Sequence, residues 1–249
     1  MAIHAAMVDR IDQEVGRILD QLKTMGADQN TIVLFLSDNG ASSEQIIRGN
    51  GHDPSALPGS GDSYLCLGPG FSTACNTPFR RHKFWTHEGG ISTPLIVYWP
   101  DGIKARGEFR NSMGHVIDLL PTFLDLAGVN PLLENNGYKA PPLPGKSLVK
   151  VFESDQEKDR EIYYSHEGNK ALVQGNWKAV ISPYQDGKWQ LYNMKSDRTE
   201  LSDQSSTYPK SVTTIPYPWL KSKQDILDKM ILRWEELDNL YQSQGKESQ

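Results

Sequence analysis

Two polar residues that follow an apolar run are the first in the chain whose types suggest chemistry. Asp38 and Asn39 come directly after residues 31–36, which read as a buried strand, and ligands in α/β proteins bind at the carboxyl ends of strands. Their oxygens suit calcium or magnesium, but calcium takes about 6 to 8 oxygens, so further ligands would have to come from elsewhere. Alternatively, the pair forms an Asx-type turn that only caps the reversal at Gly40.

Residues 76–90 gather fixed cations and histidines ahead of a glycine pair. The members are Arg80, Arg81, Lys83, His82 and His87, followed by Gly89 and Gly90. Arginine and lysine bind tetrahedral oxyanions well, and the glycines would let backbone amides approach an anion closely. The segment is therefore a candidate anion cradle, although basic clusters are often only solvated surface.

The two cysteines offer too few ligands for a closed zinc site. Cys66 and Cys75 lie nine residues apart in a glycine-rich segment. In an oxidising compartment they could form one loop-closing disulfide; the other reading is two separate thiols.

The first part of the chain must position these residues. Apolar spacing predicts a helix from residue 3 to Gly26, buried central strands of parallel type at 31–36 and 94–99, and a helix over 116–127 that Gly128 ends. Residues 41–75, rich in Gly, Ser and Pro, read as a long surface insertion.

A proline-rich crossing over residues 130–145 leads into a different pattern. Short aromatic or β-branched runs separated by turns predict a small antiparallel sheet, and the chain closes with a helix over 222–242. The strands are expected at 160–165, 170–174, 177–182 and 189–194. The fold class is therefore α/β followed by a smaller α+β part, with domains at 1–135 and 136–249.

Composition excludes several classes of protein. The 249 residues carry a formal charge of −5 and 37% hydrophobic residues, which is typical of a globular protein and argues against a nucleic-acid partner. We find no apolar run long enough to span a membrane and no basic, apolar start typical of a signal peptide.

Several motifs in order along the chain resemble the later part of a type I arylsulfatase, a member of the sulfatase family. They are Ser37-Asp38-Asn39-Gly40, Asn76-Thr77-Pro78-Phe79-Arg80, His87-Glu88-Gly89-Gly90, Thr93-Pro94-Leu95, and Trp189-Gln190-Leu191-Tyr192 ahead of Thr199-Glu200-Leu201. The resemblance implies part of an alkaline-phosphatase-like sulfatase domain and then the small antiparallel sheet with its C-terminal helix.

The resemblance also implies site residues. Asp38 and Asn39 match two family ligands to a divalent metal, usually calcium, and Lys83 matches the lysine that binds the sulfate and stabilises its charge during catalysis. We assign no catalytic role to His87, Glu88 or His115. Glu88 is expected to serve the Gly89-Gly90 turn.

The chain departs from the family at the nucleophile. The family's formylglycine is made from Cys or Ser in Cys/Ser-x-Pro-x-Arg, well before the Asp-Asn pair. After Cys75, Pro78 and Arg80 stand at the third and fifth following positions rather than the second and fourth. We therefore expect the formylglycine in a missing N-terminal half, and an isolated chain that is inactive and dimerises or aggregates.

The leading hypothesis is thus the C-terminal portion of a sulfatase that cleaves a sulfated small molecule or glycan, exported to the periplasm or the cell exterior in its complete form. One alternative is a non-catalytic module or split-gene product that binds a sulfated ligand without metal. A phosphatase or phosphodiesterase of similar fold, with a metal-activated Ser or Thr, is another.

Overall fold

The computed structural model describes residues 1–45, 52–156, 160–205 and 223–247. It divides into two compact units, each built from separate stretches of the chain. Unit 1 comprises residues 1–16, 37–94 and 160–249, and unit 2 comprises residues 17–36 and 95–159. The division into 1–135 and 136–249 stays a prediction.

The first helix confirms its prediction from the apolar spacing. Helix α1 (Ala2–Thr24) contains no buried residue, and its apolar residues Met7, Ile11 and Ile18 are each at least half exposed. Gly26 follows it with a φ of 65°, the left-handed conformation that ends helices. The apolar stripe therefore identified the helix, although this chain does not bury it.

Unit 2 holds the two expected apolar strands, but their direction was predicted wrongly. Strands β1 (Val33–Leu36) and β2 (Leu95–Tyr98) pair antiparallel, with Val33 opposite Tyr98. An apolar run indicates that both faces are suited to burial and carries no information on strand direction, so the parallel assignment had no independent support. The sheet has only these two strands among the described residues.

The rest of unit 2 is short helices joined by irregular chain. A 3₁₀ turn η1 (Val116–Asp118) leads into α4 (Leu119–Ala127), and Gly128 with a φ of 64° ends it as predicted. The proline-rich crossing contains a small hairpin that the sequence did not indicate. Its strands are β3 (Glu134–Asn135) and β4 (Tyr138–Lys139), and helix α5 (Val149–Glu153) follows the crossing.

Unit 1 contains the small antiparallel sheet, which confirms its prediction. Its strands run in chain order: β5 (Glu161–His166), β6 (Asn169–Gln174), β7 (Trp177–Ile181) and β8 (Gln190–Asn193). Glu167 and Gly168 both have positive φ in the tight β5–β6 turn, as hairpins with two-residue loops require. Unit 1 also holds α2 (Gly68–Asn76) and α3 (Glu88–Ile91).

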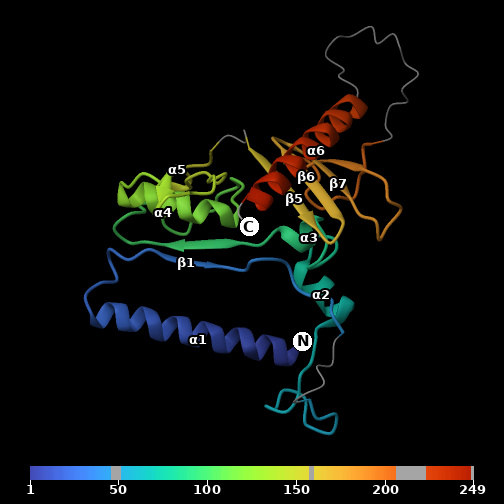
Figure 1. Cartoon of the computed structure of the whole chain (residues 1–249). Helices are drawn as coiled ribbons and strands as arrows, with labels where there is room; N and C mark the ends of the chain where they lie inside the picture. The colour runs from blue at the N-terminus through green and yellow to red at the C-terminus, as the bar shows by residue number, and fades with distance from the viewer. Residues whose placement is uncertain (46–51, 157–159, 206–222, 248–249) are drawn as a thin grey trace. The chain divides into compact units, whose positions relative to one another are not determined.

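Helix α6 (Lys223–Glu247) covers one face of this sheet (Figure 1). Trp234, Met230 and Leu237 of the predicted apolar stripe are buried against Leu172 and Leu191 of the sheet. Their packing forms the main hydrophobic core of unit 1, which leaves the other face of the sheet for different contacts.

Helix α2 begins within residues 41–75, which were predicted as a long surface insertion with no helix in it. It begins at Gly68, next to Pro69, and its buried residues are Gly68 and Ser72. Proline in the first helical turn was a usable start signal, but glycines on both sides of it obscured the helical pattern. None of the helices in the described part of the chain combines the length and apolar character needed to cross a lipid bilayer.

Candidate functional site

Asp38 and Asn39 lie in a turn that follows β1. Ser37 Oγ donates to the Asn39 carbonyl at 2.9 Å, and Asn39 Nδ2 donates to the Gly40 carbonyl at 3.0 Å. Asp38 is exposed. The amide nitrogen of Asn39 thus serves the turn, while a metal would take its oxygen, so the turn and metal interpretations are compatible.

Backbone contacts join this turn to the segment that carries Lys83. The Gly40 amide donates to the Gly90 carbonyl at 3.0 Å, and the Lys83 amide donates to the Ala41 carbonyl at 3.0 Å. Asn76 Oδ1 accepts from the Ala41 amide at 2.8 Å. The structure therefore brings the predicted metal ligands and the predicted sulfate lysine into neighbouring segments.

Glycines make this junction possible. A Cβ on Gly40 would lie 1.8 Å from the Gly89 carbonyl oxygen, and one on Gly90 would lie 2.0 Å from that of Trp85. Both are far below contact distance, so Gly40 packs on Gly89 across the junction, and Gly90 packs on Trp85 within residues 80–90, only because neither glycine carries a side chain.

The loop formed by residues 80–85, here the Lys83 loop, is held in an unusual conformation. Arg81 has a φ of 69° and Phe84 a φ of 92°, and such residues persist only where their surroundings enforce them. Asn76 Nδ2 donates to the Arg81 carbonyl and Asn169 Nδ2 to the Phe84 carbonyl, each at 3.2 Å. Lys83, between these two turns, is exposed.

The structure corrects the expected cradle of three cations. Arg80 turns toward the small sheet, where its Nη1 donates to Tyr192 Oη at 3.1 Å and to the Glu200 carbonyl at 2.7 Å. The Arg81 guanidinium lies over the Trp85 ring, 4.3 Å from its centre, and burial together with Arg80 lowers its pKa. Arg80 is therefore committed to structure, and Lys83 is the exposed cation of the three.

The glycine amides also bind within the protein instead of presenting themselves to an anion. The Gly89 amide donates to the Arg80 carbonyl at 2.9 Å, and the Gly90 amide donates to the His87 carbonyl at 2.8 Å. These bonds close the loop onto itself, so both glycine amides already have partners within the protein.

Neither histidine of the segment is suited to carry a proton at neutral pH. His87 is fully buried and lies 3.3 Å from Gln190 through Nε2 and Oε1. Burial, with Lys178 nearby, lowers its pKa to about 3. Burial and Arg81 also lower the pKa of His82. His115 caps η1 by accepting from the Ile117 amide at 3.3 Å.

Glu88 has a partner that the sequence did not indicate. Lys178 Nζ on β7 lies 2.8 Å from Glu88 Oε1 and 2.8 Å from Glu200 Oε1, and all three residues are buried. Burial alone would lower the pKa of Lys178, but the two carboxylates raise it, whereas burial raises the pKa of Glu200. Partners separated by 90 residues or more leave no local signal, so Glu88 was assigned to the turn alone.

Within the described residues, no group of three His, Cys, Asp or Glu side chains is placed to hold a metal ion. Asp38 and Asn39 would supply two oxygen donors of the type calcium prefers. Cys66 and Cys75 are both exposed thiols.

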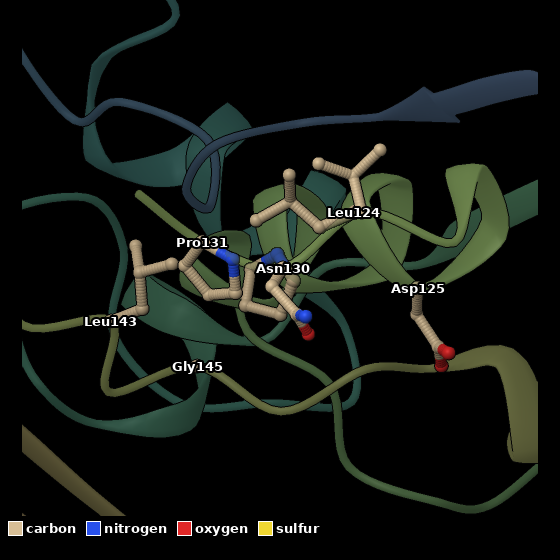
Figure 2. A pocket seen from close by; sticks show the side chains of 8 residues that line it. Leu124, Asp125, Asn130, Pro131, Leu143 and Gly145 are labelled. Carbon is tan, nitrogen blue, oxygen red and sulfur yellow. The ribbon is translucent and has the colours of Figure 1, made fainter. Parts of the chain in front are cut away.

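A separate pocket of about 310 Å³ lies in unit 2, beside α4. Figure 2 shows Leu124, Pro131 and Leu143 on its wall together with Asp125, whose Oδ2 accepts from Ser147 Oγ at 2.5 Å. None of Asp38, Asn39 and Lys83 lines it.

Comparisons with known proteins show similarity to sulfatases. The model of the sulfatase family matches residues 1–129, and the model of the C-terminal region of N-sulphoglucosamine sulphohydrolase matches residues 80–215. The structure is also similar to the crystal structure of Ps i-CgsB, with a TM-score of 0.65 and 27% identity over 94% of this chain and 42% of that one.

Curated relatives are sulfatases as well. An uncharacterized sulfatase of Schizosaccharomyces pombe is 31% identical over 88% of this chain and 42% of its own length. The N-acetylgalactosamine-6-sulfatase of Mus musculus is 32% identical over 76% of this chain and 31% of its own length. The arylsulfatase of Klebsiella aerogenes is 33% identical over 61% of this chain and 34% of its own length. The chain thus spans less than half the length of these relatives, and it belongs to the sulfatase family.

Proposed function

We propose that this chain forms part of a sulfatase that hydrolyses a sulfate ester to an alcohol and sulfate. The observation that carries the proposal is the hydrogen-bonded junction between the Asp38-Asn39 turn and the Lys83 loop. A metal-binding pair and an exposed ammonium group in neighbouring segments are what recognition of a sulfate ester requires, because its oxygens carry the charge.

Asp38 and Asn39 would hold a divalent cation, most naturally calcium. Their donors are a carboxylate and an amide oxygen, the hard ligands that calcium selects, and they supply two of the roughly six to eight positions. When bound, the cation would act as a Lewis acid toward the sulfate oxygens. The remaining ligands would come from a part of the protein outside residues 1–249.

Lys83 would bind the sulfate and stabilise the charge that develops on it during reaction. Its amide is fixed by the Ala41 carbonyl, and the turns at Arg81 and Phe84 flank it. A cation carried on a backbone held in this way would stabilise that charge electrostatically.

The nucleophile would also come from outside the chain. A formylglycine requires Cys/Ser-x-Pro-x-Arg, and neither Cys66 nor Cys75 stands in that pattern. We infer that the purified chain hydrolyses aryl sulfates only at the background rate and binds calcium weakly, since it has part of the ligand set and no nucleophile.

The partner that completes the site would be the N-terminal half of the enzyme. The β1–β2 sheet has apolar side chains on both faces, and Phe35 and Ile96 are 48% and 59% exposed. Strands of this type are normally covered, so we propose that the missing half adds strands there and that the chain self-associates without it. Export to the periplasm or the cell exterior is proposed for the complete enzyme.

The first experiment is to sequence the gene upstream of the Met1 codon. An in-frame Cys/Ser-x-Pro-x-Arg supports the proposal, and the complete enzyme is then assayed with 4-nitrophenyl sulfate and calcium. Lys83→Ala should lower kcat by about 100- to 1,000-fold, as loss of one charge-stabilising group does in other hydrolases. Lys229→Ala, which removes an exposed lysine of α6 on the opposite side of the small sheet, should leave kcat unchanged.

An upstream stop codon, or a Lys83→Ala enzyme with full activity, would contradict this proposal. In the first case the test moves to binding: affinity of the isolated chain for a sulfated oligosaccharide without calcium would favour the non-catalytic module. Phosphate-ester turnover in preference to sulfate-ester turnover would favour the phosphatase alternative.

A further inference from the structure

One face of the small sheet contacts the site segment with side chains from three of its strands. Asn169, Lys178, Gln190 and Tyr192 share this face, because Lys178 pairs with Tyr192 in register and the others alternate with residues that face α6. We call these four residues the support face. It lies opposite the face covered by α6.

Each residue of the support face contacts a different residue of the segment 80–88. Asn169 binds the Phe84 carbonyl, Lys178 binds Glu88, Gln190 meets His87, and Tyr192 accepts from Arg80. The contacts thus flank Lys83 on both sides in the sequence, although no residue of the support face was a predicted site residue.

The charges are concentrated at Lys178. Its side chain is fully buried, and Glu88 and Glu200 lie on it at 2.8 Å each. The Glu88 amide donates to Glu200 Oε2 at 3.0 Å, and Arg198 Nη2 lies 3.6 Å from Glu88 Oε2. Apolar side chains would fill such a position at least as favourably, so a buried ion group of this kind is weak evidence for stability alone and is better explained by the geometry that it specifies.

We propose that Lys178, together with Glu88 and Glu200, is a positioning device that holds the Lys83 loop in its sulfate-binding conformation. The inference rests on the proposed role of Lys83. Lys178 fixes Glu88, and Glu88 is followed directly by Gly89 and Gly90, whose backbone packs on the Lys83 loop and on Gly40. The sheet therefore sets the position of Lys83 and, through Gly40, of the Asp38-Asn39 turn.

The test compares Lys178→Met with Leu191→Ala in the 249-residue chain. Leu191 belongs to the same sheet but packs on the α6 side, so its replacement weakens the sheet without touching Glu88. Hydrogen exchange is measured by mass spectrometry, and peptides covering 80–90 are compared with peptides from β5 and β6. Lys178→Met should speed exchange in 80–90 about tenfold or more relative to the sheet, because local opening raises exchange selectively. Leu191→Ala should raise both together.

A second readout is the affinity for inorganic sulfate, measured by calorimetry. Lys178→Met should lose affinity while Leu191→Ala retains it. Equal exchange ratios in the two variants would overturn the positioning role, whatever sulfate does. Exchange decides whether Lys178 holds the loop independently of sulfate binding, because this chain carries only part of the proposed sulfate site.

Glu200→Gln keeps the test decisive if Lys178→Met does not fold. This substitution preserves shape and leaves the Lys178–Glu88 pair in place, so the fold should survive. It should raise exchange in 80–90 by a smaller factor than Lys178→Met would, in the same direction. No change in exchange with Glu200→Gln would then contradict the proposal.

Discussion

Replacing Gly40 by alanine tests whether the junction between the two site segments depends on close backbone packing. The added Cβ would lie 1.8 Å from the Gly89 carbonyl oxygen and 2.9 Å from its carbon. The segments must therefore separate by more than about 1 Å, and an overpacked contact of this kind costs about 1–3 kcal/mol. The Gly40–Gly90 and Ala41–Asn76 hydrogen bonds would weaken too, at about 0.5–1.5 kcal/mol each.

The expected loss for Gly40→Ala is therefore about 2–6 kcal/mol of unfolding free energy, measured by urea denaturation with circular dichroism. Gly61→Ala is the matched control, because a Cβ there meets no atom within 4 Å and its φ is not positive. If Gly40→Ala were as stable as Gly61→Ala to within about 0.5 kcal/mol, the usual range for harmless surface changes, the packing argument would be refuted.

Three further changes have defined expectations. Trp234→Ala removes a side chain that is 2% exposed and whose Nε1 donates to the Tyr164 carbonyl at 3.0 Å, so urea denaturation should show a loss of about 3–5 kcal/mol. Burial lowers the pKa of His87 to about 3. Between about pH 3 and about pH 6.5, the unfolded chain therefore protonates this histidine and the folded chain does not. Stability should thus fall on acidification across this window, by up to about 1.4 kcal/mol per pH unit; His87→Asn should lack that contribution, whereas His4→Asn should retain it. Gly16→Ala, inside α1 with no atom within 4 Å of the new Cβ, should raise the free energy of unfolding by up to about 1 kcal/mol, seen as a stronger helical circular dichroism signal and a higher midpoint of thermal unfolding.

The sequence predicted those parts of the fold whose determinants are local. The β5–β8 strands were found because glycine turns separate short aromatic and β-branched runs, and α6 because Met230, Trp234 and Leu237 recur at helical spacing. Strand direction in β1 and β2 was not predictable in this way, because it depends on where the intervening residues return the chain.

The candidate site shows the same division. Asp38, Asn39 and Lys83 stand in recognisable local motifs, and the structure places them in neighbouring segments, while their metal and sulfate roles stay predictions. The partners of Arg80 and Glu88 could not be found, since Tyr192 and Lys178 lie 112 and 90 residues away. A buried lysine in a strand also reads as an ordinary surface position in an alternating pattern, so Lys178 gave no sign of its role.

The Lys83 loop and the support face are in contact but lie far apart in the sequence, and this affects the order of events during biosynthesis. Glu88 leaves the ribosome 90 residues before Lys178, an interval of roughly 5 to 20 seconds at ordinary rates of translation. During that time every residue of the proposed sulfate site present in this chain has been made, while the contacts that shape it do not yet exist. Maturation of the site must therefore be a late event, and a nonsense mutation between residues 190 and 192 would remove Tyr192 and Glu200 from the contacts of this segment without altering Asp38, Asn39 or Lys83.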